Sequence, residues 1–471
     1  MNRYRSAALA AAMAISVPAV HAADGAVDTS FGDNGVARVG LTDSSGGSVG
    51  CRPLIQPDGK ILMCGTRVEN GTSGSDFFVA RFLPDGTLDE DFSFDGIATV
   101  DFDDGDGTDF AAGIALQDDG RIVIVGTTSQ PSVPADFAIA RLTTDGLLDT
   151  SFGAGTGKTT VAFDLDGGTG ADTATSVALQ PDGRIVVAGS ATVDGRLQVA
   201  ATRLLPDGSR DSAFNVNGKV AFGFAMPGGS AEDDAASAVA IDAAGRIVLG
   251  VLVAYTDGGA DRQQAFGVAR LRANGAPDPD FHANGRTTLA YDPGNGISEI
   301  ASAGMILQQD GRIVLMGYAD SSASAEDNFD AAVVRFLPDG TPDAGFGSGG
   351  IVLVPFDMTA NGLDYLVGGV EQSGGRLLLG GTALGDPVQY ATAVRLLPSG
   401  ALDPDFGLFG KAIYDFGLTV PDGQLFSGIA LQGPHAIAGG IAYVPPGGDT
   451  THIDTYLVRL AMDAIFADGF D

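Results

Sequence analysis

The chain contains few of the residues that most catalytic and metal sites use. It has no tryptophan, two cysteines and four histidines among 471 residues. Three of the histidines, His282, His435 and His452, follow the N-terminal segment and show no metal-ligand spacing. The absence of tryptophan removes the commonest platform for stacking a sugar ring. We therefore assign no catalytic residue from composition and no cofactor other than the calcium considered below.

Basic residues and long apolar stretches are also scarce. Lys and Arg number 26 against 59 Asp and Glu, which gives a net charge of −33 at pH 7. This charge would repel nucleic acid and anionic lipid, so neither is expected as a partner. No segment after the N-terminus approaches the ~20 apolar residues that a membrane-spanning helix needs.

The N-terminus has the three parts of a secretory signal. Arg3 and Arg5 precede an apolar run over residues 7–20, and small residues precede Ala23. This pattern predicts a signal peptide over residues 1–22 and export to the periplasm or the extracellular space. In that oxidising setting Cys51 and Cys64 would form a disulfide, or alternatively remain two buried thiols.

One sequence unit recurs seven times along the rest of the chain. Its turn glycine, usually followed by Lys or Arg, recurs at intervals of 61 to 66 residues. Its other two marks are an arginine that closes an apolar stretch and an Asp three residues before a Phe. The turn glycines are Gly59, Gly120, Gly183, Gly245, Gly311 and Gly375, with a degenerate seventh copy near Gly433. Such a period is typical of stacked or circular repeats rather than of unrelated domains.

Each unit is expected to form four short strands. In the second copy these lie at residues 97–102, 112–117, 121–127 and 136–142. The continuous β-branched run from Ile122 to Val125 favours a strand that is covered on both faces. Gln-Pro-Asp-Gly between the second and third strands is typical of a hairpin turn.

The predicted fold is all-β, a seven-bladed β-propeller of four-stranded antiparallel blades over residues 23–464. A β-solenoid is the alternative, disfavoured because the first and seventh units look complete. Residues 465–471 form a C-terminal tail, either a terminal tag or a degenerate repeat docked on the ring. Constant turns would occupy one face of the ring and variable loops the other.

The repeat resembles a known family. Residues 179–189, Leu-Gln-Pro-Asp-Gly-Arg-Ile-Val-Val-Ala-Gly, and residues 140–153 are similar to the delta-60 repeat of secreted bacterial proteins. The resemblance extends from about residue 28 to residue 460. It implies a propeller-like fold and an exported protein, and it implies no catalytic residue.

The repeated arginines and aspartates are interpreted as structural. In six copies the arginine precedes the Asp by eight residues, which predicts a charge-assisted pair between strand end and linker. The arginines are Arg81, Arg141, Arg203, Arg270, Arg335, Arg395 and Arg459. The aspartates are Asp89, Asp149, Asp211, Asp278, Asp343 and Asp403, with Asp28 in the remaining copy. The alternative leaves each arginine head in water. The Phe residues of the linker are expected to plug the spaces between blades.

Acidic residues in the variable loops are candidates for binding calcium, which takes carboxylate oxygens. The residues are Asp103, Asp104, Asp106, Asp109, Asp166 and Asp172. Neither loop matches an EF-hand, and acidic loops also serve solubility alone. An acid stands eleven residues before the turn glycine at Asp109, Asp172, Asp234 and Asp364.

Three functions remain open from the sequence. The first is a secreted, monomeric, non-catalytic propeller that binds a protein or glycan through its variable acidic loops. The second is an enzyme with its site at the central channel, calcium-dependent in one version, for which acids with raised pKa should converge at one channel mouth. The third is a structural component of the envelope. The first is the main prediction.

Overall fold

The computed structural model describes residues 24–39, 44–49, 51–69, 74–102, 107–165, 170–224, 230–231, 233–256, 262–323, 328–359, 362–385, 388–416, 424–444 and 452–462. The predicted signal peptide, the tail at 465–471 and the candidate calcium ligands Asp103, Asp104, Asp106 and Asp166 lie outside these residues. No helix in the described part is long and apolar enough to cross a membrane.

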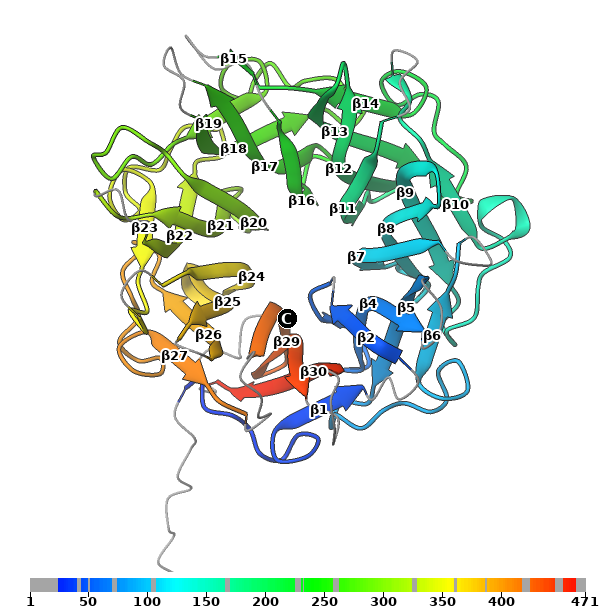
Figure 1. Ribbon diagram of the computed structural model, residues 1–471, viewed down its shortest axis with the longest axis horizontal. Coiled ribbons are helices and arrows are strands. Elements are labelled where there is room, and N and C mark those ends of the chain that lie inside the picture. The colour runs from blue at the N-terminus through cyan, green and yellow to red at the C-terminus, as the bar shows by residue number, and fades with distance from the viewer. Residues whose placement is uncertain are drawn as a thin grey trace, which may run out of the picture.

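Antiparallel sheets form a ring around a central opening (Figure 1). Four of the sheets have four strands, one has five and one has nine in the described residues. The nine-stranded sheet is two neighbouring groups, which a single parallel pair between Ser75 and Thr108 joins. The fold is therefore all-β, built largely from four-stranded antiparallel sheets.

The strands follow one another around the ring in chain order. The first group contains β2 (Ser44–Val49), β3 (Leu54–Ile55), β4 (Ile61–Glu69), β5 (Ser75–Phe82) and β6 (Ile97–Val100), and the second contains β7 (Thr108–Leu116), β8 (Ile122–Gln130), β9 (Val133–Leu142) and β10 (Lys158–Val161). Next come β11 (Asp172–Leu179), β12 (Ile185–Val193), β13 (Arg196–Leu204) and β14 (Lys219–Phe222), and then β15 (Ser230–Ala231), β16 (Ala235–Ile241), β17 (Ile247–Thr256), β18 (Arg262–Leu271) and β19 (Arg286–Leu289).

The second half of the ring repeats this arrangement. Its strands are β20 (Ile300–Leu307), β21 (Ile313–Asp320), β22 (Phe329–Phe336) and β23 (Ile351–Val354), followed by β24 (Asp364–Gln372), β25 (Arg376–Leu384), β26 (Gln389–Leu396) and β27 (Lys411–Tyr414). The last sheet contains β28 (Gln424–Gln432), β29 (His435–Val444), β30 (His452–Ala461) and β1 (Val36–Val39). Among the described residues, the short 3₁₀ turn η1 (Gly153–Gly155) lies between β9 and β10, and η3 (Ser373–Gly375) lies between β24 and β25.

The sheets are shifted by one strand relative to the sequence unit. The segment at 97–102 was expected to share a sheet with the strands that follow it. Instead β6 pairs with β5 of the preceding unit, and β10 takes the outer position beside β9. This shift lets each outer strand connect one sheet to the next. The last sheet shows the same shift, because β1 takes its outer position and pairs antiparallel with β30 along Val36 to Val39.

The third segment of each sequence unit forms a strand of continuous apolar residues that is covered on both faces, as β8 illustrates. Ile122, Val123, Ile124 and Val125 have no exposed surface, and alternate residues belong to the cores on the two sides of their sheet. The hairpin that precedes β8 turns at Gly120, whose φ of +83° favours glycine. The amide of Gln117 donates to the carbonyl of Arg121 at 2.8 Å to close this turn.

Linker phenylalanines pack between neighbouring sheets. Each ring lies against a glycine of the next copy, where an added Cβ would meet it at 2.6 to 3.1 Å. The pairs are Phe92 and Gly146, Phe152 and Gly208, Phe214 and Gly275, Phe281 and Gly340, Phe346 and Gly400, Phe406 and Gly25, and Phe31 and Gly86. The pair of Phe406 and Gly25 joins the C-terminal and N-terminal parts of the chain, so the same contact recurs around the ring.

Candidate functional site

The repeated arginines contact the linker aspartates. Arg141 Nε lies 2.8 Å from Asp149 Oδ2, and the two side chains are 6% and 8% exposed. The corresponding pairs are Arg81 and Asp89, Arg203 and Asp211, Arg270 and Asp278, Arg335 and Asp343, Arg395 and Asp403, and Arg459 and Asp28. In the first six copies a Lys or Arg from the hairpin turn approaches the same carboxylate. Each linker Asp thus holds two parts of its own copy together.

The same arginines reach the next copy. Arg81 Nη1 donates to the carbonyl of Thr144 at 2.5 Å, and Arg270 Nη1 donates to that of Pro338 at 2.6 Å. Each guanidinium also lies over the linker Phe of its own copy, as Arg81 does over Phe92 at 4.5 Å. Arginine, aspartate and phenylalanine together form a structural joint between copies.

The arginine pairs lower the pKa of the linker carboxyls. Burial alone would raise the pKa of Asp149, but hydrogen bonds from Ser151 and the charge of Arg141 outweigh it and lower the value. The pKa of Asp89, Asp211 and Asp278 is lowered in the same way, with arginine among the causes. These carboxylates therefore stay ionised well into the acid range.

The acids eleven residues before the turn glycine each accept a hydrogen bond from the amide of a phenylalanine that follows the outer strand of the preceding sheet. The amide of Phe163 donates to Asp172 Oδ2 at 2.6 Å, and that of Thr192 donates to Oδ1 at 3.3 Å. Asp109, Asp234 and Asp364 accept from Phe102, Phe224 and Phe356 in the same way. We call these four carboxylates the latch aspartates. The hydrogen bond from a phenylalanine amide to Oδ2, which all four share, explains the spacing seen in the sequence as a structural feature.

Burial raises the pKa of three latch aspartates. Asp172, Asp234 and Asp364 are each at most 3% exposed, and the pKa of each is raised to about 6 despite hydrogen bonds from the backbone. They lie in different copies and point at different amides. They do not converge as the acids of a channel-centred catalytic site were expected to do.

Acidification from pH 7.5 to pH 5 is expected to stabilise the fold. Because the folded pKa of the three latch carboxyls lies above the unfolded value, their protonation favours the folded state below about pH 6, and this stabilisation is lost as pH rises. Each would contribute on the order of 2 kcal/mol. Urea denaturation in 0.5 M NaCl, which screens surface repulsion, measures the effect.

The control for this prediction is Asp234→Asn, which removes one titrating group. The difference in unfolding free energy between pH 5 and pH 7.5 should become smaller in this variant. Equal or greater stability of the unsubstituted protein at pH 7.5 in high salt would contradict the assignment.

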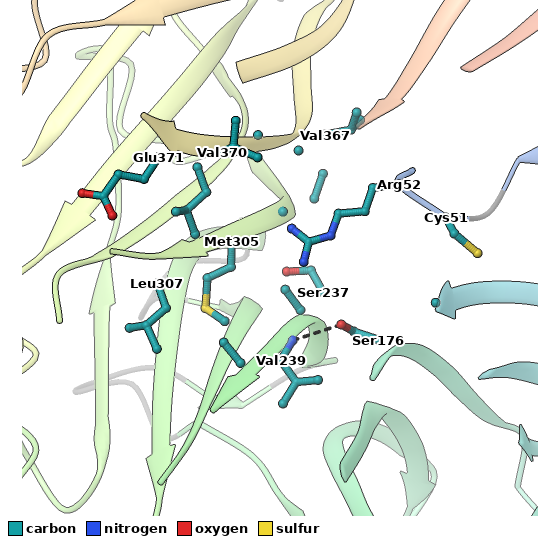
Figure 2. A pocket seen from close by; sticks show the side chains of 18 of the residues that line it. Cys51, Arg52, Ser176, Ser237, Val239, Met305, Leu307, Val367, Val370 and Glu371 are labelled. Atoms are coloured by element: carbon teal, nitrogen blue, oxygen red, sulfur yellow. Dashed lines mark hydrogen bonds between the residues drawn. The ribbon is translucent and has the colours of Figure 1, made fainter. Parts of the chain in front are cut away.

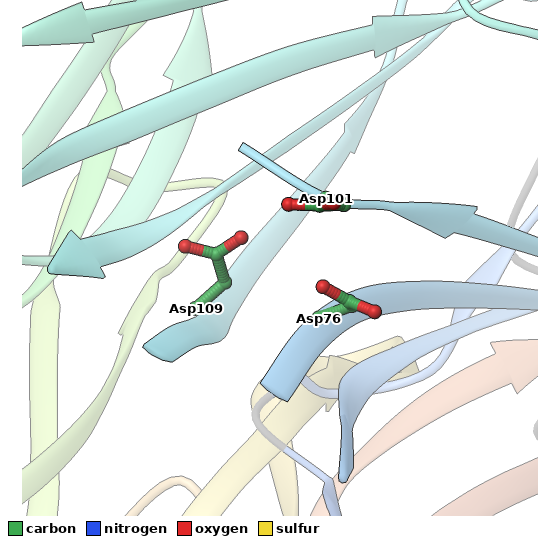
Figure 3. Close-up of side chains that lie close together, drawn as sticks. All are labelled: Asp76, Asp101 and Asp109. Atoms are coloured by element: carbon green, nitrogen blue, oxygen red, sulfur yellow. The ribbon is translucent and has the colours of Figure 1, made fainter. Parts of the chain in front are cut away.

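One group of acids lies close together. Carboxylate oxygens of Asp76 in β5, Asp101 after β6 and Asp109 in β7 lie within 4.8 Å of one another (Figure 3). Of the two candidate calcium ligands that the structure describes, Asp109 belongs to this group, and its Oδ2 also accepts the amide of Phe102. Asp172, the other described candidate, holds Phe163 and Thr192. Calcium binding stays a prediction.

A large cavity lies on the axis of the ring. Its volume is about 1140 Å³, and the innermost strand or segment of every copy contributes to its lining (Figure 2). Six inner strands carry a one-residue bulge there, at Ala112, Thr175, Ser237, Ala303, Val367 and Ser427. Bulges bend a strand and turn a side chain away from the ladder. Each of these six copies therefore presents a bulge to the cavity, and most of the bulge residues are small.

Hydroxyl groups of the lining tie neighbouring strands together. Thr175 Oγ1 donates to the carbonyl of Ala236 at 2.8 Å, and Ser427 Oγ donates to that of Cys51 at 3.1 Å. Ser176 Oγ accepts the amide of Val239 at 3.2 Å (Figure 2). The wall is thus polar and held in place by hydrogen bonds.

Two lining residues carry charge, and the sequence analysis missed both. Arg52 stands where the next five copies have Gly113, Ser176, Ala238, Gly304 and Gly368. Glu371 stands where other copies have Ile55, Leu116, Leu179, Ile241 and Leu307. Its two carboxylate oxygens accept from Gln308 Nε2 at 2.9 Å and from the amide of Gln309 at 2.8 Å. Comparing the copies position by position would have found these departures from the repeat.

The disulfide lies beside this cavity. Cys51 and Cys64 are bonded to each other, with their Cα atoms 5.4 Å apart and both side chains buried. Val49 pairs with Gly65 and Leu54 with Leu62, so two extra residues are accommodated between β2 and β3. The pairing of β2 with β4 and that of β3 with β4 therefore differ in register by two residues, and Cys51 lies in the segment where the register changes.

Several comparisons relate the chain to known proteins. A family model described as a domain of unknown function (DUF5122) β-propeller matches residues 56–92, 117–152, 180–214, 245–281, 308–346 and 372–406. No curated protein matches the sequence.

The chain is also similar to solved structures. The crystal structure of the polysaccharide lyase Uly1 is 12% identical, covers 88% of this chain and 90% of its own, and has a TM-score of 0.49. The α-L-arabinofuranosidase Arb93A from Fusarium graminearum is 11% identical, with coverage of 93% and 98% and a TM-score of 0.40. The Bacillus subtilis arabinanase Arb43A is 13% identical, with coverage of 65% and 94% and a TM-score of 0.32. At these identities the likeness concerns the fold and transfers no substrate.

These comparisons correct the main functional prediction. The sequence favoured a non-catalytic binding or scaffold protein, because no catalytic motif was visible. The three similar structures are named as a polysaccharide lyase, an α-L-arabinofuranosidase and an arabinanase, so the prediction of a non-catalytic protein is not kept, and its alternative of an enzyme stands as a proposal. One β-propeller repeat is matched six times between residues 56 and 406, which supports a propeller-repeat family for this chain.

Proposed function

We propose that the chain is an exported, monomeric seven-bladed propeller of delta-60 repeats that acts as a carbohydrate-active enzyme at its central cavity. The blade count is supported by seven arginine–aspartate pairs and seven phenylalanine–glycine contacts. Closure of the ring is supported by the pairing of β1 with β30 and by the contact between Phe406 and Gly25. Export is supported by the charged, apolar and small-residue pattern of residues 1–22.

The cavity on the axis is the observation that carries the functional proposal. Its volume of about 1140 Å³ lies slightly above the range of ~300–1,000 Å³ usual for small-ligand sites, and would hold an oligosaccharide. Its wall combines serine and threonine oxygens with backbone at glycines that keep exposed surface, such as Gly113 and Gly374. Such a wall suits a ligand with many hydroxyl groups, since each can donate or accept a hydrogen bond.

The charged lining residues limit the chemistry that the cavity can perform. Glycosidases usually place two carboxylates on either side of the bond that they cleave. Among the lining residues that the structure describes, Glu371 is the one carboxylate. The described lining therefore does not supply the facing pair of carboxylates that most glycosidases use. We assign no residue to the proton-transfer step.

Filling the cavity is expected to abolish turnover without unfolding the protein. Ala303 is an exposed bulge residue in the cavity wall, so Ala303→Trp would occupy the ligand volume. We expect kcat/KM on a cleaved polysaccharide to fall by about tenfold or more, since the ligand would lose its place beside the reacting groups. Reducing ends and the absorbance of unsaturated products, measured over neutral and acidic polysaccharides, report the activity.

Ala401→Trp is the matched control, because Ala401 is exposed on a linker outside the cavity. It should retain the activity and the melting temperature of the unsubstituted protein. Two results would overturn the proposal. One is absence of cleavage on every polysaccharide tested, and the other is full activity of a correctly folded Ala303→Trp variant.

A further inference from the structure

Arg52 differs from every corresponding residue in the cavity wall. It stands seven residues before the turn glycine Gly59, and the five following copies have glycine, serine or alanine at that position. Gly428 of β28 corresponds to it in the last sheet, directly after the bulge at Ser427. A long cationic side chain thus replaces a small neutral one in a single copy. A structural role common to all copies therefore does not account for Arg52.

The backbone around Arg52 is fixed on three sides. Cys51 is bonded to Cys64 of β4, and its carbonyl accepts the hydroxyl of Ser427 at 3.1 Å. Gly428 lies so close that an added Cβ would meet the Arg52 Cβ at 2.5 Å. With its backbone held in this way, Arg52 projects into the cavity (Figure 2). The fold therefore fixes the point from which the Arg52 side chain extends into the cavity.

No hydrogen bond or ion pair links Arg52 to another residue in the part of the chain that the structure describes. The seven structural arginines, in contrast, all contact a linker aspartate. The surrounding sheets shield the guanidinium from bulk water, and this burial lowers its pKa. The side chain nevertheless keeps exposed surface inside the cavity, and an arginine remains charged at neutral pH.

An uncompensated cation in a partly shielded cavity attracts an anion strongly. The planar guanidinium offers paired donors that match the oxygens of a carboxylate or sulfate group. The protein as a whole carries a charge of −33, so a general surface attraction cannot recruit anions. Recognition of an anion would have to occur locally at Arg52.

We infer that Arg52 is the anion-recognition residue of the cavity and that its ligand is a saccharide with carboxylate or sulfate groups. The inference rests on the proposed function for the saccharide part of the ligand. Hydroxyl and backbone groups of the wall, including Ser237 and Gly113, would contact the neutral parts of the same ligand. Arg52 thereby selects acidic polysaccharides over neutral ones such as arabinans.

Calorimetric binding with defined oligosaccharides tests the inference. The probes are trigalacturonate, its fully methyl-esterified form, and a sulfated galactan trisaccharide. The variants are Arg52→Gln, which removes the charge, Arg52→Lys, which keeps it, and the matched control Arg272→Gln, whose arginine is exposed outside the cavity. The melting temperature of each variant shows whether it folds.

We expect the unsubstituted protein to bind trigalacturonate, the sulfated probe or both, and to bind the methyl ester at least about tenfold more weakly. Arg52→Gln should weaken acidic-probe binding by about tenfold or more and leave ester binding unchanged. Arg52→Lys should recover part of the affinity, and Arg272→Gln should leave it unchanged. The two acidic probes show whether carboxylate or sulfate is preferred.

The inference is overturned if no acidic probe binds, or if a folded Arg52→Gln variant binds the acidic probes as tightly as the unsubstituted protein. Failure of the proposed function gives a different pattern. In that case acidic probes bind through Arg52 but no polysaccharide is cleaved. Cleavage of neutral polysaccharides that is unaffected by Arg52→Gln would support the enzyme and reject the anionic ligand.

Discussion

Replacing Arg141 by alanine is expected to lower the free energy of unfolding by about 3–5 kcal/mol, because it leaves the buried carboxylate of Asp149 without its main charged partner. Arg141 is 5% exposed and Asp149 is 6% exposed. The same substitution removes the hydrogen bonds from Arg141 to Ser151 and to the carbonyl of Pro206 in the next copy. It also removes the contact with the ring of Phe152. Urea denaturation with a two-state fit measures the loss.

Arg121→Ala is the matched control, since Arg121 approaches the same carboxylate at 2.9 Å but its side chain is 40% exposed. An exposed ion pair contributes about 0–1 kcal/mol, so this variant should remain close to the unsubstituted protein in stability. The two variants remove the same charge type from the same aspartate and differ mainly in burial. An unchanged denaturation midpoint for Arg141→Ala would contradict its role as a joint.

Gly208→Ala is expected to destabilise the fold by about 3 kcal/mol or more, which combines left-handed backbone strain with overpacking. Gly208 has a φ of +84°, and an added Cβ would lie 2.7 Å from the ring of Phe152 and 2.8 Å from the backbone nitrogen of Gly153. That nitrogen is fixed because it donates to the carbonyl of Asp207 at 2.9 Å. Neither neighbour can move without opening the contact between copies. Thermal and urea denaturation both report the change.

Gly195→Ala separates the two parts of this cost. Gly195 has a φ of +75°, and nothing lies within 4 Å of the position of an added Cβ. Its replacement should cost only the left-handed backbone strain, about 1–2 kcal/mol. If the two alanine variants lost equal stability, the contact between phenylalanine and glycine would contribute nothing beyond backbone conformation.

The repeat pattern predicted much of the fold because each structural joint uses residues at a fixed spacing. The offset of eight between Arg141 and Asp149 corresponds to one ion pair in the structure. The phase of the sheets was not predictable in this way. The segment at 97–102 has the same apolar pattern whichever neighbour it pairs with, and only the three-dimensional arrangement places β6 beside β5.

The candidate site could be predicted less well, since its residues are exceptions to the repeat. The acids before the turn glycines were candidates because they recur. The structure shows that they recur because each accepts a backbone amide, as Asp172 does from Phe163. Arg52 and Glu371 occur in single copies, and their importance depends on facing a cavity that the linear pattern does not reveal. A charged residue that replaces a small or apolar one within a repeat is therefore the signal to look for.

The pairing of β1 with β30 has a consequence for folding during synthesis. Residues 36–39 leave the ribosome long before residues 455–458, with which they form their ladder. The first strand to be synthesised must stay unpaired until almost the whole chain has emerged, and a protein stopped short of β30 lacks the partner for its own beginning. Completion of the ring is consequently a late event, and a prematurely terminated chain would expose a strand edge open to aggregation.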